Sequence, residues 1–380
     1  MRISIAATTI SVAAMIVSLS FINGFQEVVA AKVFNFWGHI RIQHYEPVKS
    51  TMAEETPIVE TTETMLAIQS NNQIKSVTRF ATRSAIINAN GTIEGVLLKG
   101  VAGDYPFEKL DQFLVKGRWP ADGQMQDELE IAISRHTANQ LETDTGKSVL
   151  MYFIQENAEQ PKTRKVRICG IFNTGIDVYD KVYAIGQLSL IQKMNNWSEK
   201  QIGGYEIDLN TPAAMQETGE SLFQLLPPGL NAFTLKELSP EIFDWLNLPN
   251  TNKYILIAVM SIVAVINLIT CLIILLLERT PMIALLKSMG ARDHVIQETF
   301  ILYGSWIAGI GIFCGAFLGL SICIFQQKWQ FIQLNEEAYY VKTAPVSIDP
   351  SQVLLIISGT FIISMLTLII PSLIIRRISP

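Results

Sequence analysis

Few side chains in this 380-residue sequence have the types and the spacing that chemistry at a site requires. Thr145-Gly146-Lys147-Ser148 ends like a nucleotide-binding P-loop, but that motif needs its first glycine at position 141, which is Leu141. A polar turn before a strand is the better interpretation of this segment. Any ATP hydrolysis would therefore have to come from another chain.

The histidines and cysteines indicate no site either. His39 and His44 share a short segment, but no carboxylate or cysteine completes a metal-binding set, so we expect surface histidines there. Ser134 and His136 lie close together without the elbow motif or the acid that a nucleophile needs. Cys169 is the one cysteine in a polar region, and we interpret all four as small buried hydrophobes. We predict no catalytic residue and no metal ligand.

The composition indicates a membrane protein. The chain is 49% hydrophobic and 17% charged, whereas about 25% of the residues in an average soluble domain are charged. The net charge of −5 argues against nucleic acid as a partner, because phosphates attract clustered Lys and Arg. The charged residues are concentrated in residues 23–252. A polar domain therefore interrupts a very apolar framework.

Four segments are long and apolar enough to cross a membrane, which takes about 20 helical residues. They are residues 3–22, 254–277, about 300–325 and about 353–375. Arg2 before an apolar run would also suit a signal peptide, but no small-residue cleavage site follows, so we expect a retained helix over residues 1–22.

The basic residues of the short loops predict the orientation of these helices. The loop after the second segment and the C-terminal end carry most of them, namely Arg279, Lys287, Arg292, Arg376 and Arg377. Both regions are therefore expected in the cytoplasm, together with the N-terminus. Residues 23–252 then fold outside the cytoplasmic membrane.

Glycines recur every four residues in the third apolar segment, at Gly311, Gly315 and Gly319. Small residues at this spacing form a groove in which a second helix approaches closely. We interpret them as helix-packing residues. The plainer alternative is that glycine is simply common in membrane helices.

Residues 280–290 are predicted to form a short amphipathic helix. Thr280 suits the N-cap and Pro281 the first helical position. An apolar stripe follows, and Gly290 suits the C-terminal cap; the stripe consists of Ile283, Leu286 and Met289 or Gly290. Periodicity alone leaves two readings open, a helix that only buries its apolar side in lipid and a docking element for a cytoplasmic partner.

Several motifs resemble those of a known family. They are Ser18-Leu19-Ser20-Phe21-Ile22-Asn23-Gly24-Phe25 (LSxxNGF in the family), Gly38-His39-Ile40 (PHI), Cys169-Gly170-Ile171-Phe172-Asn173-Thr174-Gly175 with Tyr179-Asp180 (GIFxxG…YD), Asn267 (FN), and Glu278-Arg279 followed by Ile283 to Ala291 (ERxxxIAILKxLGA). In this order the chain resembles the MacB/FtsX superfamily of ABC transporter permeases. Within it, the chain is most similar to the lipoprotein-releasing permeases LolC and LolE.

This resemblance implies a fold and a function. The fold would be an α-helical membrane protein with four transmembrane helices and an α/β domain, with porter and sabre parts, in the periplasm between the first two helices. The function would be a permease subunit of an ABC transporter in the bacterial inner membrane that extracts lipoproteins for transfer towards the outer membrane. A separate cytoplasmic ATPase of the LolD type would bind ATP and Mg²⁺ and drive the outer domain by mechanotransmission.

The resemblance also implies partners and site residues. A second permease subunit, identical or different, the lipoprotein, membrane lipid and a periplasmic carrier of the LolA type would be partners. The family's ATPase-coupling helix corresponds to Glu278, Arg279, Ile283, Leu286, Lys287, Met289 and Gly290. An acyl-chain groove would be lined by Met15, Phe21, Phe25, Ile262 and Ile266.

Some features depart from the family's pattern. The carrier-binding hook of the LolC type would fall near residues 155–165, which lack a hook signature. The chain also looks clipped at both ends, before Arg2 and after Ser379-Pro380. Two alternatives stay open, a MacB-like efflux permease and an FtsX-like regulator of a cell-wall hydrolase.

The outer region shows alternating apolar runs and helical patterns, as an α/β domain should. Strands are predicted at residues 74–87, 94–99, 148–154 and 164–171, and helices at residues 60–71 and 134–142.

Overall fold

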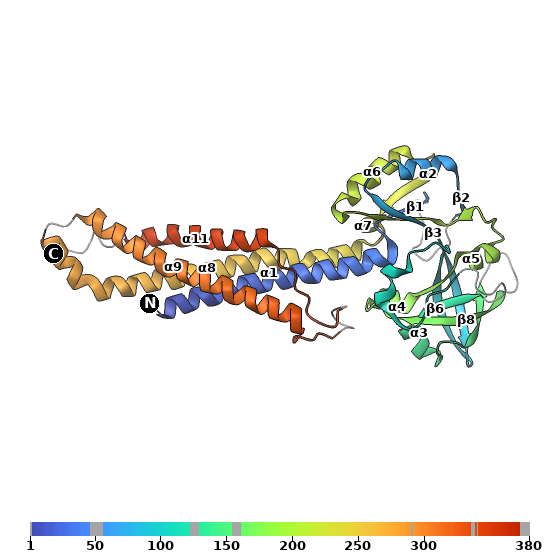
Figure 1. Cartoon of the computed structure of the whole chain (residues 1–380), viewed down its shortest axis with the longest axis horizontal. Coiled ribbons are helices and arrows are strands. Elements are labelled where there is room, and N and C mark those ends of the chain that lie inside the picture. The colour runs from blue at the N-terminus through green and yellow to red at the C-terminus, as the bar shows by residue number, and fades with distance from the viewer. Residues whose placement is uncertain are drawn as a thin grey trace. The chain divides into compact units, whose positions relative to one another are not determined.

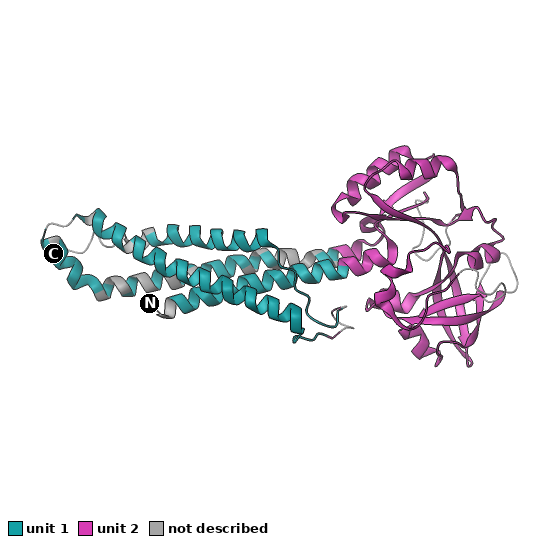
Figure 2. Cartoon of the chain, viewed as in Figure 1, with its two compact units in different colours: residues 1–29, 244–334, 341–380 teal, residues 30–243, 335–340 magenta. Residues whose placement is uncertain are grey.

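The computed structural model describes residues 2–45, 56–121, 129–153, 161–289, 292–335, 339 and 341–372. The chain divides into two compact units (Figure 2). Unit 1 comprises residues 1–29, 244–334 and 341–380, and unit 2 comprises residues 30–243 and 335–340.

Unit 1 is built from long apolar helices (Figure 1). They are α1 (Arg2–Trp37), which continues into unit 2, α8 (Pro240–Ser288), α9 (Asp293–Trp329) and α11 (Pro350–Ser372). Among the described residues, three helical segments are long and apolar enough to cross a membrane: Ile5–Trp37, His294–Trp329 and Pro350–Leu368. The remaining predicted segment, 254–277, is helical within α8, where several side chains are not described.

These helices share one apolar cluster. Its buried members are Val12, Met15, Ile16 and Leu19 of α1, Ile312 and Ala316 of α9 and Ile356 of α11, and Ile257 and Met260 of α8 pack against it. Because lipid tails are as apolar as these side chains, close packing rather than the hydrophobic effect holds such a bundle together.

α1 extends 15 residues beyond the predicted end of the first segment at Ile22. The polar residues Asn23 and Gln26 end the hydrophobic run, but helix-forming residues continue. The last turn is buried in unit 2, where Val33 is 0% and Phe36 1% exposed. Tertiary burial, which hydropathy does not report, therefore sets the end of this helix.

Unit 2 contains a ten-stranded mixed sheet and a two-stranded sheet, β2–β10. In the large sheet the order is β12-β1-β11-β3-β4-β9-β6-β8-β5, and β7 pairs with β3 and β8. The pairs β4–β9 and β6–β8 are parallel, and the other pairs of this sheet are antiparallel. The strands are β1 (Ile40–His44), β2 (Ile58–Val59), β3 (Ile74–Ala89), β4 (Thr92–Val101), β5 (Leu114–Gly117), β6 (Glu130–Ser134), β7 (Ser148–Phe153), β8 (Lys162–Phe172), β9 (Tyr183–Gln187), β10 (Gln201–Ile202), β11 (Gly204–Leu209) and β12 (Leu230–Thr234).

Short helices cover this sheet: α6 packs on β12, α5 on β3 and β4, and α3 on β6. The helices of unit 2 are α2 (Thr62–Gln69), α3 (Arg135–Gln140), α4 (Asp177–Val182), α5 (Leu188–Asn195), α6 (Met215–Leu225) and α7 (Leu235–Leu238), with 3-10 turns at Phe107–Lys109, Asp111–Phe113 and Pro212–Ala214. The helices and strands predicted for the outer region are confirmed, with boundaries shifted by a few residues.

Candidate functional site

The segment predicted as a separate helix at residues 280–290 is the C-terminal end of α8. The helix runs from Pro240 to Ser288 and passes through Thr280 and Pro281 without a break. The predicted start at Thr280 is therefore wrong. A proline in a helix removes one hydrogen bond but keeps helical dihedral angles, so apolar helix formers on both sides carry the helix through.

The exposed apolar residues of this helix end share only Met289 with the predicted stripe. Ile283 is 0% exposed and Leu286 is half-buried, so the predicted stripe faces inward in part. Met282, Leu285 and Met289 are instead 46%, 61% and 77% exposed. Their spacing of three and four residues places them along one side of the helix. We call these three residues the apolar stripe of α8.

The other residues predicted for this region are described only in part. Arg279 is exposed. Glu278 and Lys287 belong to α8, but their side chains lie outside the described residues, as does Gly290 entirely.

The three predicted glycines of α9 lie against α1. A β-carbon at Gly311 would stand 2.8 Å from Cβ of Thr8, and one at Gly319 would stand 3.2 Å from Cα of Ala13. Thr9 also donates a hydrogen bond from Oγ1 to the Gly311 carbonyl (3.2 Å). The glycines allow two helix backbones to approach more closely than larger residues would permit.

The residues predicted to line an acyl-chain groove differ in how exposed they are. Met15 is 1% exposed and belongs to the buried cluster of the helices, so it lines no open groove in the single chain. Phe21 and Phe25 are half-buried, and Ile262 and Ile266 are 58% and 56% exposed.

A polar cluster ties together three helices of unit 1. Asn23 of α1 donates a hydrogen bond to Gln352 of α11 (2.7 Å), and Lys253 of α8 donates to Asn23 (3.2 Å) and to Gln352 (3.4 Å). Beside them, a β-carbon at Gly24 would stand 2.7 Å from the Pro345 carbonyl oxygen. The asparagine and glycine of the LSxxNGF-like motif thus have packing roles here.

The end of α1 is enclosed by side chains of unit 2. Phe36 stacks on Tyr179 at 4.8 Å, and Arg41 lies 4.2 Å above the ring of Trp37. Burial of one such aromatic side chain contributes about 1.5–3 kcal/mol. We call the residues around Phe36 and Trp37 the α1 socket: Arg41, Phe80, Lys99, Phe172, Tyr179 and Tyr183.

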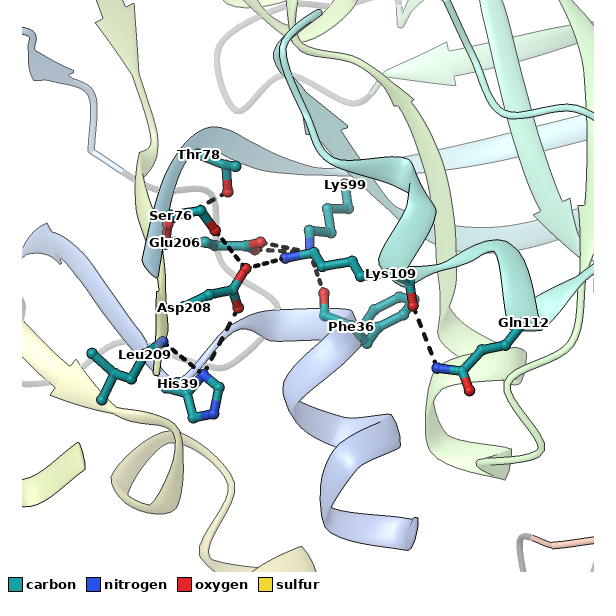
Figure 3. Close-up of polar contacts among 10 residues, drawn as sticks. All are labelled: Phe36, His39, Ser76, Thr78, Lys99, Lys109, Gln112, Glu206, Asp208 and Leu209. Atoms are coloured by element: carbon teal, nitrogen blue, oxygen red, sulfur yellow. Dashed lines mark hydrogen bonds and ion pairs between the residues drawn. The ribbon is translucent and has the colours of Figure 1, made fainter. Parts of the chain in front are cut away.

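A buried ion pair lies in this socket (Figure 3). The side chains of Lys99 on β4 and Glu206 on β11 are both 1% exposed, with 2.8 Å between Lys99 Nζ and Glu206 Oε1. Lys99 also donates a hydrogen bond to the carbonyl of Phe36. Burial lowers the pKa of Lys99 to about 8, although the Glu206 carboxylate acts in the opposite direction.

A second carboxylate, Asp208, lies beside this pair (Figure 3). It accepts hydrogen bonds from Lys109 (2.9 Å) and from Ser76 (3.0 Å). Burial alone would raise the pKa of Asp208, but interactions with His39, Lys109 and Ser76 outweigh it and hold that pKa well below its usual value. His39 is 9% exposed and its Nδ1 lies 3.8 Å from Asp208 Oδ1, so the expectation of a surface histidine is wrong.

The GIFxxG…YD-like motif forms another contact with α1. The Asp180 carboxylate accepts hydrogen bonds from the backbone N–H groups of Thr174 and Gly175, both 2.9 Å, and thereby fixes this loop. The carbonyl of Thr174 then accepts a hydrogen bond from Lys32 of α1 (2.8 Å). Two motifs distant in sequence therefore hold the same helix end.

Sequence reasoning missed the Lys99–Glu206 pair. Lys99 lies in the run Val96–Val101, whose other members are apolar or glycine. A lysine in such a strand was the available signal of a buried charge, but nothing in the sequence identified a partner 107 residues away.

The expected turn at the P-loop-like segment is confirmed: Gly146 has a left-handed φ of +85°, and β7 begins at Ser148. Cys169 and Cys323 are buried, whereas Cys314 is exposed and so contradicts the interpretation of every cysteine as buried. Within the described ranges, no three His, Cys, Asp or Glu side chains are grouped so that they could hold a metal ion.

Two known families match this chain. The FtsX-like permease C-terminal family matches residues 254–380, and the MacB-like periplasmic core domain family matches residues 3–223, more than half of the chain. The chain belongs to the MacB/FtsX permeases. As a MacB/FtsX permease, it is a non-catalytic, multi-pass membrane subunit with a periplasmic MacB-like domain. Membership of this family also implies an ABC ATPase as a partner.

Other MacB/FtsX permeases resemble the chain over nearly its whole length. The lipoprotein-releasing system transmembrane protein LolE of Haemophilus influenzae is 23% identical over 385 residues, which cover 98% of this chain and 90% of that protein. LolC of Neisseria meningitidis is 22% identical over 392 residues, covering 97% and 90%. The crystal structure of the periplasmic region of MacB from Actinobacillus actinomycetemcomitans matches with a TM-score of 0.36 and 13% identity, covering 54% of this chain and 92% of that one.

Proposed function

We propose that this MacB/FtsX permease extracts lipoproteins from the inner membrane for transfer towards the outer membrane, driven by a separate cytoplasmic ATPase. The names of the relatives LolE and LolC, which match almost the whole chain, support the choice of cargo. The observation that carries the mechanism is α1 itself, because this apolar helix ends inside the core of the periplasmic domain. A helix anchored in this way can transmit movement to that domain.

In this proposal the ATPase, which resembles LolD, docks on the apolar stripe of α8. Met282, Leu285 and Met289 are exposed, although the buried Ile283 shows that the same helix end has an inner packing side. An amphipathic helix whose apolar residues are exposed is a common docking element for a partner's groove. ATP and Mg²⁺ bind to the ATPase, and this chain contributes no group to hydrolysis.

The transporter would contain two permease chains, identical or different, and the released lipoprotein would pass to a periplasmic carrier of the LolA type. Residues 155–165, where a carrier-binding hook would fall but where the sequence lacks a hook signature, lie mostly outside the described residues. Residues 162–165 begin β8, in a hairpin with β7. The carrier's binding surface on this chain is therefore left unassigned.

Depletion of the protein in its host tests the proposed cargo. We expect lipoproteins destined for the outer membrane to accumulate in the inner membrane, as measured by fractionation and immunoblotting. Unchanged lipoprotein sorting together with new drug sensitivity would indicate a MacB-like efflux permease instead. Unchanged sorting with chained cells would indicate an FtsX-like regulator of a cell-wall hydrolase.

A further inference from the structure

The last turn of α1 is buried in unit 2, where Phe36 is 1% and Trp37 3% exposed. The final carbonyls of a helix have no partner within the helix, and a buried carbonyl without a partner costs free energy. Lys99 Nζ donates a hydrogen bond to one of these, the carbonyl of Phe36. Its positive charge also interacts favourably with the negative end of the helix dipole.

Glu206 balances the charge of Lys99 from another strand. In the sheet order β11-β3-β4, the strands that carry Glu206 and Lys99 flank β3. Glu206 is in register with Thr78 and Lys99 with Thr82, and these two β3 residues lie four apart and so on one face. The ion pair therefore crosses β3 on the face that meets the end of α1, and joins that helix end to the two strands on either side of β3.

Stability alone is a poor explanation for this arrangement. Two charges lose their hydration when they are buried, and apolar side chains of similar volume often give an equal or greater stability. Aromatic rings already surround the site, with the ring of Trp37 4.2 Å from Lys99 Nζ. The pair instead fixes the orientation of the helix end. A hydrogen bond from an ammonium held in place permits one position of the Phe36 carbonyl, whereas apolar contacts tolerate rotation and sliding of the helix.

We propose that Lys99 and Glu206 are positioning residues that fix the rotation and the axial position of the end of α1 on the sheet. Movement of α1 during the ATPase cycle is then transmitted to the periplasmic domain and is not absorbed by slippage in the socket. This inference rests on the proposed function, since it assigns the pair a role in lipoprotein release.

The test replaces both charged residues at once, Lys99→Met with Glu206→Gln, so that no single buried charge is left unpaired. The matched control is Lys116→Met with Asp144→Asn, which removes an ion pair of the same domain whose side chains are 56% and 48% exposed. All variants are made in the full chain and purified with the ATPase.

Three quantities are compared: the melting temperature, the ATPase rate, and the lipoprotein released per ATP hydrolysed. We expect the Lys99/Glu206 variant to keep the ATPase rate and to release at least about fivefold less lipoprotein per ATP. The Lys116/Asp144 control should match the wild type in all three. An unchanged yield per ATP in the Lys99/Glu206 variant would overturn the inference. If that variant cannot be purified, Lys99→Leu with Glu206→Leu takes its place, since it too leaves no buried charge unpaired.

A second readout does not depend on the cargo. Spin labels are placed at Ala31 of α1 and Val178 of α4, both exposed and both in unit 2. We expect the distances between the two labels to form one narrow distribution in the wild type and the control. In the Lys99/Glu206 variant we expect a broad distribution. Equal distributions would refute the positioning role. A wild type that releases no lipoprotein but shows the expected distances would refute only the proposed function.

Discussion

Gly315 of α9 lies so close to Val12 of α1 that a β-carbon at residue 315 would stand 2.7 Å from the β-carbon of Val12. It would also stand 2.8 Å from the backbone oxygen of Thr9, which cannot move aside as a flexible side chain would. Real β-carbons do not tolerate such separations, so the two helices meet at this distance only because residue 315 is glycine.

Gly315→Leu should therefore force α1 and α9 apart. Overpacking of this kind costs about 1–3 kcal/mol. We expect a lower melting temperature of the purified protein in detergent. Gly309→Leu on the same helix is the control, because a β-carbon at Gly309 meets no atom within 4 Å. Equal melting temperatures for the two variants would contradict the packing shown here.

Leu285→Glu should release the ATPase from the permease. Leu285 is 61% exposed in the apolar stripe of α8, and a charge there would have to be buried in the docked complex. We expect loss of ATPase co-purification with an unchanged melting temperature of the permease. Ser288→Glu, an exposed position about 90° around the helix from the centre of the stripe, is the control.

The sequence-based prediction differs here, because it assigns contacts with the ATPase to Leu286 and Ile283. Ile283→Ala should instead lower the stability of the permease, by about 2–5 kcal/mol, because it leaves a cavity at a fully buried site. A loss of ATPase binding in Ile283→Ala without a loss of stability would restore the predicted stripe.

Lys99 should make the free energy of unfolding of unit 2 depend on pH in the alkaline range. Its pKa is about 8 in the folded protein, whereas an unfolded lysine has a pKa of about 10.4. Between these values the unfolded chain binds more protons, so the free energy of unfolding rises with pH. Relative to the Lys99→Met/Glu206→Gln variant, the free energy of unfolding of the wild type should rise by up to about 1.4 kcal/mol per pH unit. A difference that stays constant between pH 7.5 and 9.5 would contradict the buried ammonium.

Asp208 should give a pH dependence of the same sign, but in the acid range: the free energy of unfolding should rise with pH there too. Its pKa is held below the usual value of about 3.9, so its contribution to stability is present above that value and is lost as the pH falls further. Relative to Asp208→Asn, the wild type should be more stable at pH 7, and the difference should shrink below pH 4. Thermal melts across this range provide the measurement.

Much of the fold follows from local patterns. The apolar runs predicted the long helices, and alternation predicted strands such as β3 and β4, because both depend on nearby residues. The end of α1 did not follow, since its last turn is helical through contacts with Tyr179 and Lys99. The start predicted at Thr280 failed because N-cap and proline signals permit a helix start without requiring one.

The candidate sites were predictable to a lesser degree. The glycine spacing on α9 predicted a packing face, and α1 lies against it. Met289 of the α8 stripe was predicted, but the other two members were each predicted one position too far along, because a helical period gives the width of a face but not which neighbour covers it. The Lys99–Glu206 pair depends on strand order, which no local pattern in these two strands encodes.

ATP-dependent release of a triacylated lipoprotein from proteoliposomes measures the proposed transport itself. The liposomes contain the permease with its ATPase, and a soluble periplasmic carrier collects the product. The account predicts release with ATP in the wild type and none with Leu285→Glu. Hydrolysis of ATP by the wild-type complex with no lipoprotein leaving the membrane would contradict it.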